Sequence, residues 1–337
     1  MRGLVASAFT KTILRSIRGS LGRFLAIMGI VALGCGFFAG LQMSGPDMRA
    51  AANEFYDGTN LYDIRLVSTL GFTERDVERV AGTQGVAGIM PAISCDVMAR
   101  LGKEQLAMRV SSLDVDAASA GQEQGANVVL SQDGNYLNRV FLREGRWPQA
   151  ADECVLTADK PVDGMGVGST VEVLYGTVDL KDVLRKRTLK VVGMVSSSNY
   201  PYTGSFGSTT LGSGMIGEYA FVSPDAFVDD APFTEIYLRV AGADAYESGS
   251  DEYQAAVDEV AHRLEEKESA LAAARLADVR TKAQDEVDEG RQEYQTEKDK
   301  AQRELEDARK KLDDAERELA DGRRELADGW SEYEEGA

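Results

Sequence analysis

A run of twenty uncharged residues near the N-terminus, FLAIMGIVALGCGFFAGLQM at positions 24–43, constrains the fold of this chain more than any other feature. With a rise of 1.5 Å per residue, a helix of this length spans roughly 30 Å, the thickness of the hydrocarbon core of a bilayer. The sequence therefore predicts a transmembrane helix over residues 24–43.

The charges on either side of this run predict its orientation. Residues 1–24 carry five basic side chains and no acidic one, and Asp47 is the first acidic residue of the chain. Because basic flanks remain in the cytoplasm, we expect a cytoplasmic N-terminus and an extracytoplasmic location for residues after 45. Residues 1–23 place an apolar face opposite their cations, which predicts a cytoplasmic amphipathic helix on the inner leaflet of the cell membrane.

A cleaved signal peptide is the alternative for the same region, because basic residues before an apolar stretch are also typical of secretion signals. The tetrapeptide ALGC at 32–35 resembles a lipoprotein cleavage site, but its leucine is out of place there. Signal sequences normally have an apolar region of about 7–15 residues, and here the run continues to Leu41. The length favours a retained membrane helix.

Small residues recur every fourth position within the predicted membrane helix, at Ala32, Gly36 and Gly40. This spacing allows the backbones of membrane helices to approach closely. It predicts packing against further membrane helices, either of the same protein or of a second copy of it.

The middle of the chain, residues 44–245, contains short segments rich in β-branched and aromatic residues, which are typical of strands. Thr73 and Asp76 have the spacing of a capping box at the start of a helix. Ser223 followed by Pro224 indicates a second helix start. We therefore predict an extracytoplasmic α+β core domain over residues 44–245. Its expected strands lie at 61–68, 92–99, 106–113, 153–157, 170–175, 188–196, 218–223 and 234–240.

Two glycine-rich stretches lie in this middle region. The segment 196–217 has the composition of an exposed loop. Phosphate binding would require a lysine after the glycines, and neither this segment nor GMGVGST at 164–170 contains one. Gly145 and Pro148 predict a chain reversal before the strand at 153–157.

No residue pattern predicts catalysis, a cofactor or a metal site. The cysteines at 35, 95 and 154 do not have the spacing of a zinc site, and buried thiols are favoured over a Cys95–Cys154 disulfide. The only histidine is His262, which leaves no Ser-His-Asp or Cys-His arrangement. The net charge of −19 also argues against nucleic-acid binding. We expect a protein that is not an enzyme.

The C-terminal region, residues 250–335, predicts a long coiled-coil stalk. It has no proline, and 28 acidic against 15 basic residues follow position 250. Apolar or small residues alternate in steps of three and four, as in a heptad seam. About 80 helical residues would reach roughly 120 Å. The seam positions are Leu305, Ala308, Leu312, Ala315, Leu319, Gly322, Leu326 and Gly329.

Gly322 and Gly329 are unusual in a helix, where glycine costs roughly 1 kcal/mol relative to alanine. On a seam they would let a facing helix come close, and near a tip they would precede a turn. The partner helix is either the same segment of another copy or a return leg of a hairpin. The alternative for this region is a solvated helix or a disordered acidic tail.

Residues 10 to about 240, and most specifically the first 80 residues of the chain, resemble the N-terminal part of ABC-transporter permeases of the FtsX/MacB type. The segment RGSLGRFLAIMGIVALGCGFFAGLQMSGPDMRAAANEFYDGTNLYDIRLV carries most of the resemblance, and LREGRWPQAADECVL and LKVVGMVSSSNYP are similar to segments of the family's outer domain. The resemblance implies a membrane subunit that works with a separate ABC ATPase and transmits motion to the outer domain. The family's further membrane helices are absent here, so we expect this sequence to be an N-terminal fragment.

The function expected from the sequence is therefore that of a permease subunit of an ABC transporter. It would transmit the motion of a partner ATPase to the extracytoplasmic domain and to the stalk, where a cell-envelope protein would bind. The alternative is a surface scaffold or adhesion protein with a single membrane span and an oligomerising coiled coil.

Overall fold

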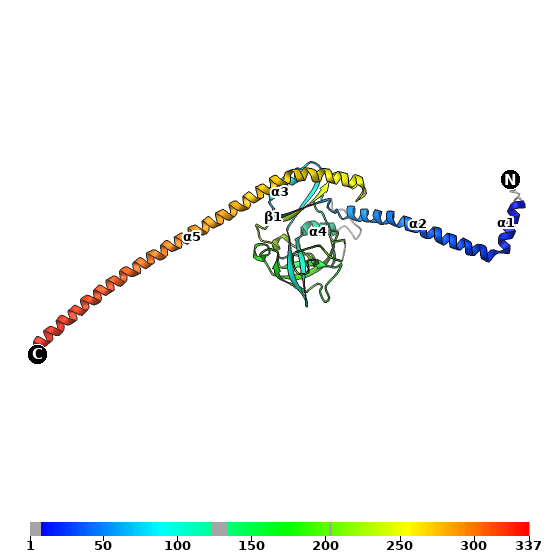
Figure 1. Ribbon diagram of the computed structural model, residues 1–337. Helices are drawn as coiled ribbons and strands as arrows, with labels where there is room; N and C mark the ends of the chain where they lie inside the picture. Colours follow the sequence, from blue (N-terminus) through cyan, green and yellow to red (C-terminus); the bar gives the residue numbers. More distant parts are fainter. Residues whose placement is uncertain (1–7, 123–133, 202–203, 337) are drawn as a thin grey trace. The chain divides into compact units, whose positions relative to one another are not determined.

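The computed structural model describes residues 8–122, 134–201 and 204–336. The chain forms two units, residues 1–268 and 269–337, which are described separately. The first contains all the strands, and the second is helical. The architecture is α+β, with one apolar N-terminal helix, a strand-rich core and a long C-terminal helix (Figure 1), as predicted.

Two helices form the N-terminal region. Helix α1 spans Ala8–Gly19 and α2 spans Leu21–Gly58. The predicted amphipathic segment 1–23 falls partly outside the described residues. Helix α2 is the only helix in the described part of the chain that is long and apolar enough to cross a membrane, and none of its apolar window is buried. It continues through Pro46 and ends at the buried Gly58.

A small antiparallel sheet follows, in the order β1-β10-β2. Strand β1 is Ile64–Phe72, β2 is Val86–Ala92 and β10 is Phe233–Val240. Between β1 and β2, helix α3 spans Glu74–Ala81. Thr73 caps α3 and exchanges hydrogen bonds with Asp76, which confirms the predicted capping box.

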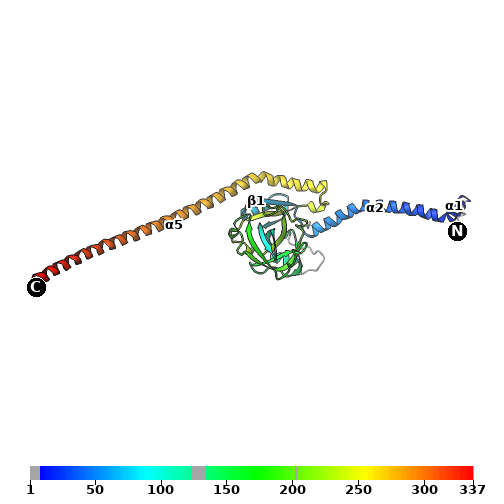
Figure 2. The same cartoon turned by 60° about the horizontal axis from the view of Figure 1, so that its bottom comes forward.

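The remaining seven strands form a second sheet in the order β5-β8-β6-β9-β4-β3-β7. Strand β7 also pairs with the first part of β8, and β5 pairs with the second part of the same strand. The ring β8-β6-β9-β4-β3-β7 is therefore closed, and its curvature can be followed in Figure 2. The strands are β3 (Ser94–Leu101), β4 (Glu104–Ser112), β5 (Val140–Gly145), β6 (Glu153–Thr157), β7 (Thr170–Gly176), β8 (Thr188–Ser197) and β9 (Ile216–Val222).

The closed ring encloses one apolar cluster and carries a second on its outer face. Alternate residues of each strand point to opposite faces, so β9 places Ala220 and Val222 in the inner cluster and Tyr219 and Phe221 in the outer one. Short helix α4, Val115–Gln122, contributes Ala118 to the outer cluster. Cys95 and Cys154 are buried free thiols in the inner cluster, as predicted, and do not form the alternative disulfide.

Several sequence predictions differ from the structure. Strands β2 and β5 were not predicted, although Gly145 has φ +81° and forms the expected reversal at the end of β5. The helix predicted after Ser223 is only a single 3-10 turn, Pro224–Ala226. The segment 196–217 is not simply exposed, because its Tyr200 and Phe206 are buried in the outer cluster.

Helix α5 spans Asp251–Gly336 without interruption. Its first turns belong to the core unit, where Val257, Val260 and Leu264 are buried. From residue 280 to residue 336 every residue of α5 is exposed, the apolar seam residues included. Helix α5 is therefore packed against the core unit only through one face of its first turns, which we call its base.

Candidate functional site

Asp63 lies between the end of α2 and the start of β1, and its carboxylate joins three elements. Its Oδ2 accepts a hydrogen bond from the Val240 amide of β10 at 2.7 Å and lies 3.5 Å from Arg239 Nε. Its Oδ1 accepts a hydrogen bond from the Tyr253 hydroxyl of α5 at 2.7 Å. The Asp63 side chain is only 3% exposed. Asp63 therefore ties the first turn of α5 to the small sheet.

Tyr253 is held as a hydrogen-bond donor. Burial, the hydrogen bond to Asp63 and the Asp63 charge all raise the pKa of the Tyr253 hydroxyl. Its backbone amide donates to Ser250 Oγ at 3.1 Å, which caps the start of α5. The same turn of helix is thus fixed by both its backbone and its side chain.

The C-terminal end of α2 is anchored to the same part of the molecule. Asn53 Oδ1 accepts a hydrogen bond from the Ser248 amide at 2.7 Å, and Asn53 Nδ2 donates to Asp57 at 3.1 Å. Arg139 Nη1 donates to the carbonyl of Gly58, the last residue of α2, at 3.2 Å. These bonds satisfy groups at the helix end and fix it to the segments before α5 and β5.

The base of α5 continues along the turn before β2. An added Cβ at Gly85 would lie 2.6 Å from Val260 Cγ2, so this glycine permits the close approach of the helix. Arg263 Nη1 donates to the Gln84 carbonyl at 3.0 Å, and Lys267 Nζ donates to Thr83 Oγ1 at 2.9 Å. Helix α5 is therefore docked along about four turns.

We refer to Asn53, Asp63, Ser248 and Tyr253, with the contacts of α5 at 83–85, as the junction. It connects α2, the small sheet and α5 through hydrogen bonds and buried apolar contacts. Its groups form no arrangement of nucleophile and base. In the described residues, no group of three or more His, Cys, Asp or Glu side chains is placed to hold a metal.

The residues predicted from the sequence are not among those that form the junction. Ala32, Gly36 and Gly40 are exposed on α2, with open space around both glycines. Leu305, Ala308, Leu312, Ala315, Leu319, Gly322, Leu326 and Gly329 are exposed on α5. The structure brings neither set against another helix of the described chain, so their roles stay predictions. His262 lies on the surface of α5, 2.9 Å from Glu265.

The junction was not identified from the sequence, although two signals for it exist. Asp63 interrupts the apolar stretch LYDIRLV, and a polar residue there is expected to have a partner when buried. Val257, Val260 and Leu264 have helical spacing just after the core domain. Neither signal identifies Tyr253 as the hydrogen-bond partner of Asp63, because the two residues are 190 positions apart in the sequence.

No protein-family model matches the sequence, and no curated protein matches it. Among solved structures, the chain is similar to the extracellular domain of the noncanonic ABC-type transporter YknZ from Gram-positive bacteria, with a TM-score of 0.28 and 11% identity over 57% of this chain and 85% of that chain. It is also similar to the periplasmic region of MacB from Actinobacillus actinomycetemcomitans, with a TM-score of 0.28 and 10% identity over 59% and 75% of the two chains. Likenesses of this size do not establish a shared function.

Proposed function

We propose that this chain is a non-enzymatic, membrane-anchored permease subunit that transmits motion from its membrane helix to an outer domain and a stalk. The observation that carries the proposal is the junction: Asn53 at the end of α2 is bonded to Ser248, and Asp63 is bonded to Tyr253 of α5. Asn53 thereby attaches the end of α2 to the segment before α5, and Asp63 attaches α5 to strand β10 of the small sheet. A mere tether between membrane and domain would need no such double attachment.

The source of the motion, in this proposal, is a separate ABC ATPase acting through further permease helices or a second copy of the chain. The support is the N-terminal resemblance and the exposed Ala32, Gly36 and Gly40 on α2. The N-terminus would lie in the cytoplasm, and the residues after 45 outside the cell membrane.

Co-purification tests the ATPase part of the proposal. The full chain, carrying an affinity tag, is solubilised from the membranes of its source cell in mild detergent and assayed for vanadate-sensitive ATP hydrolysis. We expect activity to accompany the native chain and to be weakened by a Gly36→Leu, Gly40→Leu variant, whose bulky side chains keep helices apart. The absence of vanadate-sensitive ATP hydrolysis from the native preparation would contradict the proposal.

The stalk is proposed to pair through its seam and to reach a cell-envelope protein. Leu305, Leu312, Leu319 and Leu326 are each more than half exposed, and isolated helices bury such residues against a partner. A Leu312→Asp, Leu319→Asp variant should lose helix pairing in analytical ultracentrifugation. Lys310→Asp with Arg317→Asp is the matched control, because these residues lie five positions after Leu305 and Leu312, on the opposite face of the heptad.

A scaffold or adhesion protein is the second candidate, and the exposed leucine seam is the observation that favours it. It would oligomerise through the stalk without an ATPase. Removing residues 269–337 distinguishes the two, since this cut spares the docked base of α5. Loss of oligomers with no ATPase in the native preparation would favour the scaffold.

A further inference from the structure

A cavity of about 440 Å³ opens between the small sheet and the closed ring of strands. Tyr62 and Arg65 line it from the side of β1, and Arg109 of β4 lines it from the ring. The segments 199–201 and 205–208, both after β8, also line it. The volume is in the range typical of small-molecule sites, about 300–1,000 Å³.

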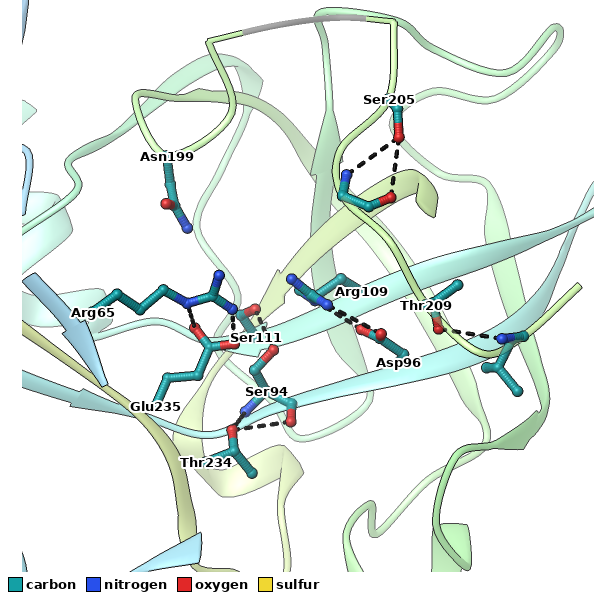
Figure 3. A network of polar contacts seen from close by, with 12 residues as sticks. Arg65, Ser94, Asp96, Arg109, Ser111, Asn199, Ser205, Thr209, Thr234 and Glu235 are labelled. Carbon is teal, nitrogen blue, oxygen red and sulfur yellow. Dashed lines mark hydrogen bonds and ion pairs between the residues drawn. The ribbon is translucent and has the colours of Figure 1, made fainter. Parts of the chain in front are cut away.

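Two arginines meet at this cavity, and each is already bound to a carboxylate in the same way (Figure 3). Arg65 donates from Nε and Nη2 to Glu235 at 3.1 and 2.6 Å. Arg109 donates from Nε and Nη2 to Asp96 at 2.7 and 3.0 Å. Such paired bonds fix the plane of a guanidinium group and keep it charged.

The third nitrogen, Nη1, is unused in both arginines. Among the described residues neither Arg65 Nη1 nor Arg109 Nη1 has a hydrogen-bond partner. Arg109 Nη1 borders the backbone of Gly207, since an added Cβ there would lie 3.7 Å from it. Burial lowers the pKa of Arg65, but the hydrogen bond to Glu235 and the charge of that carboxylate leave the pKa raised overall, and the charge of Arg109 acts in the lowering direction.

Glu235 and Asp96, the carboxylates that bind the two arginines, already accept hydrogen bonds at both of their oxygens. Glu235 also accepts a hydrogen bond from the Tyr237 hydroxyl, and both oxygens of Asp96 are bound to Arg109. The charged groups that remain available to the cavity are therefore N–H donors. Donors of this kind recognise an oxyanion, because a carboxylate or phosphate oxygen accepts two such bonds.

Aromatic side chains form the apolar part of the lining. Tyr200 stacks on the buried Tyr219 with ring centres 4.2 Å apart and meets Phe206 edge-on at 5.8 Å. Tyr62 packs against Tyr237 at 5.1 Å. These rings are held in place by their neighbours, so they offer a preformed surface beside the two guanidinium groups.

We propose that this cavity binds a small organic oxyanion, with its carboxylate or phosphate between Arg65 and Arg109 and its apolar portion against Tyr62, Tyr200 and Phe206. The ligand would connect β1 of the small sheet to β4 of the ring. Its binding would therefore stiffen the attachment of the sheet that carries α2 and α5. The proposal does not depend on an ATPase partner.

Isothermal titration of the full chain in detergent tests the proposal, with phenyl phosphate and benzoate as probes and benzamide as the neutral analogue. We expect phenyl phosphate or benzoate to bind at least tenfold more tightly than benzamide. The tighter of the two identifies a phosphate or a carboxylate as the natural group. Equal affinity for all three probes, or binding of none, would overturn the proposal.

Variants locate the binding. Arg109→Lys keeps a cation beside Asp96 but removes the free Nη1, so the affinity for the anionic probe should fall at least tenfold. Arg100→Lys is the matched control, because Arg100 is paired with Glu172 on the ring away from the cavity lining. Ser208→Trp blocks the exposed rim and leaves the ion pairs intact, and it should also abolish binding. Unchanged affinity in both Arg109→Lys and Ser208→Trp would refute the assignment.

Discussion

Glu218 gives the sharpest test of the packing in the ring. It lies on β9, is 1% exposed and shares a strand face with Ala220 and Val222 of the inner cluster. Its Oε2 has no hydrogen-bond partner within the described residues. Burial raises the pKa of Glu218 to about 8, the charge of Lys160 lowers it, and that of Glu104 raises it further.

The raised pKa of Glu218 determines the direction in which stability changes with pH. Below the ordinary pKa of 4.5, Glu218 is protonated in both the folded and the unfolded chain, and it carries no ionisation penalty. Between 4.5 and about 8 the unfolded chain ionises while the folded chain stays neutral, so stability falls by about 1.4 kcal/mol per pH unit. At pH 7 the loss reaches roughly 3 kcal/mol relative to pH 4.5.

Glu218→Gln removes the ionisation and preserves the shape of the side chain. We expect the stability of the variant relative to the native chain to rise by roughly 3 kcal/mol from pH 4.5 to pH 7. Urea unfolding in detergent is followed by Trp147, which packs on the outer cluster, in a Trp330→Phe background. Glu172→Gln, at a half-exposed position of β7, is the control. If the difference in unfolding free energy between Glu218→Gln and the native chain did not change with pH, the reasoning would be refuted.

Two further predictions concern the junction. Tyr253→Phe removes the donor to a buried carboxylate and should weaken the docking of α5 by about 1–3 kcal/mol, seen as faster amide exchange over 251–264. Tyr246→Phe, at an exposed tyrosine just before α5, should leave that exchange unchanged. Gly85→Ala places a Cβ 2.6 Å from Val260 in a backbone with φ +96°, whereas Gly168→Ala has a similar φ of +94° and open space. Thermal unfolding should therefore show a larger loss for Gly85→Ala, and equal losses would mean that only the backbone conformation matters.

The sequence predicts those elements whose signals are local. The capping box at Thr73 and the strand at 153–157 depend on neighbouring residues, and both are present. The uninterrupted helix α5 also follows from the charge-rich, proline-free composition. Strand β2 was missed because it contains Gly88 and Pro91, which are uncommon in strands.

The junction and the cavity could not be predicted because they depend on long-range pairing. Closure of the ring requires β7 to pair with β8, and no local pattern encodes that pairing. Arg65 and Arg109 meet only because β1 joins β10 while β4 joins β3. A charged residue in a strand indicates a binding site only when the residue that lies opposite it in the fold is known.

The proposed function requires that α2 and the docked base of α5 be fixed to one another through the junction. Double electron–electron resonance between spin labels at Asp47 and Glu268 measures this directly in the full chain. Both positions are exposed, and a Cys35→Ser background suffices because Cys95 and Cys154 are buried. We predict one narrow distance distribution, broadened by Asn53→Ala combined with Tyr253→Phe. A broad distribution in the chain with an intact junction would contradict the account.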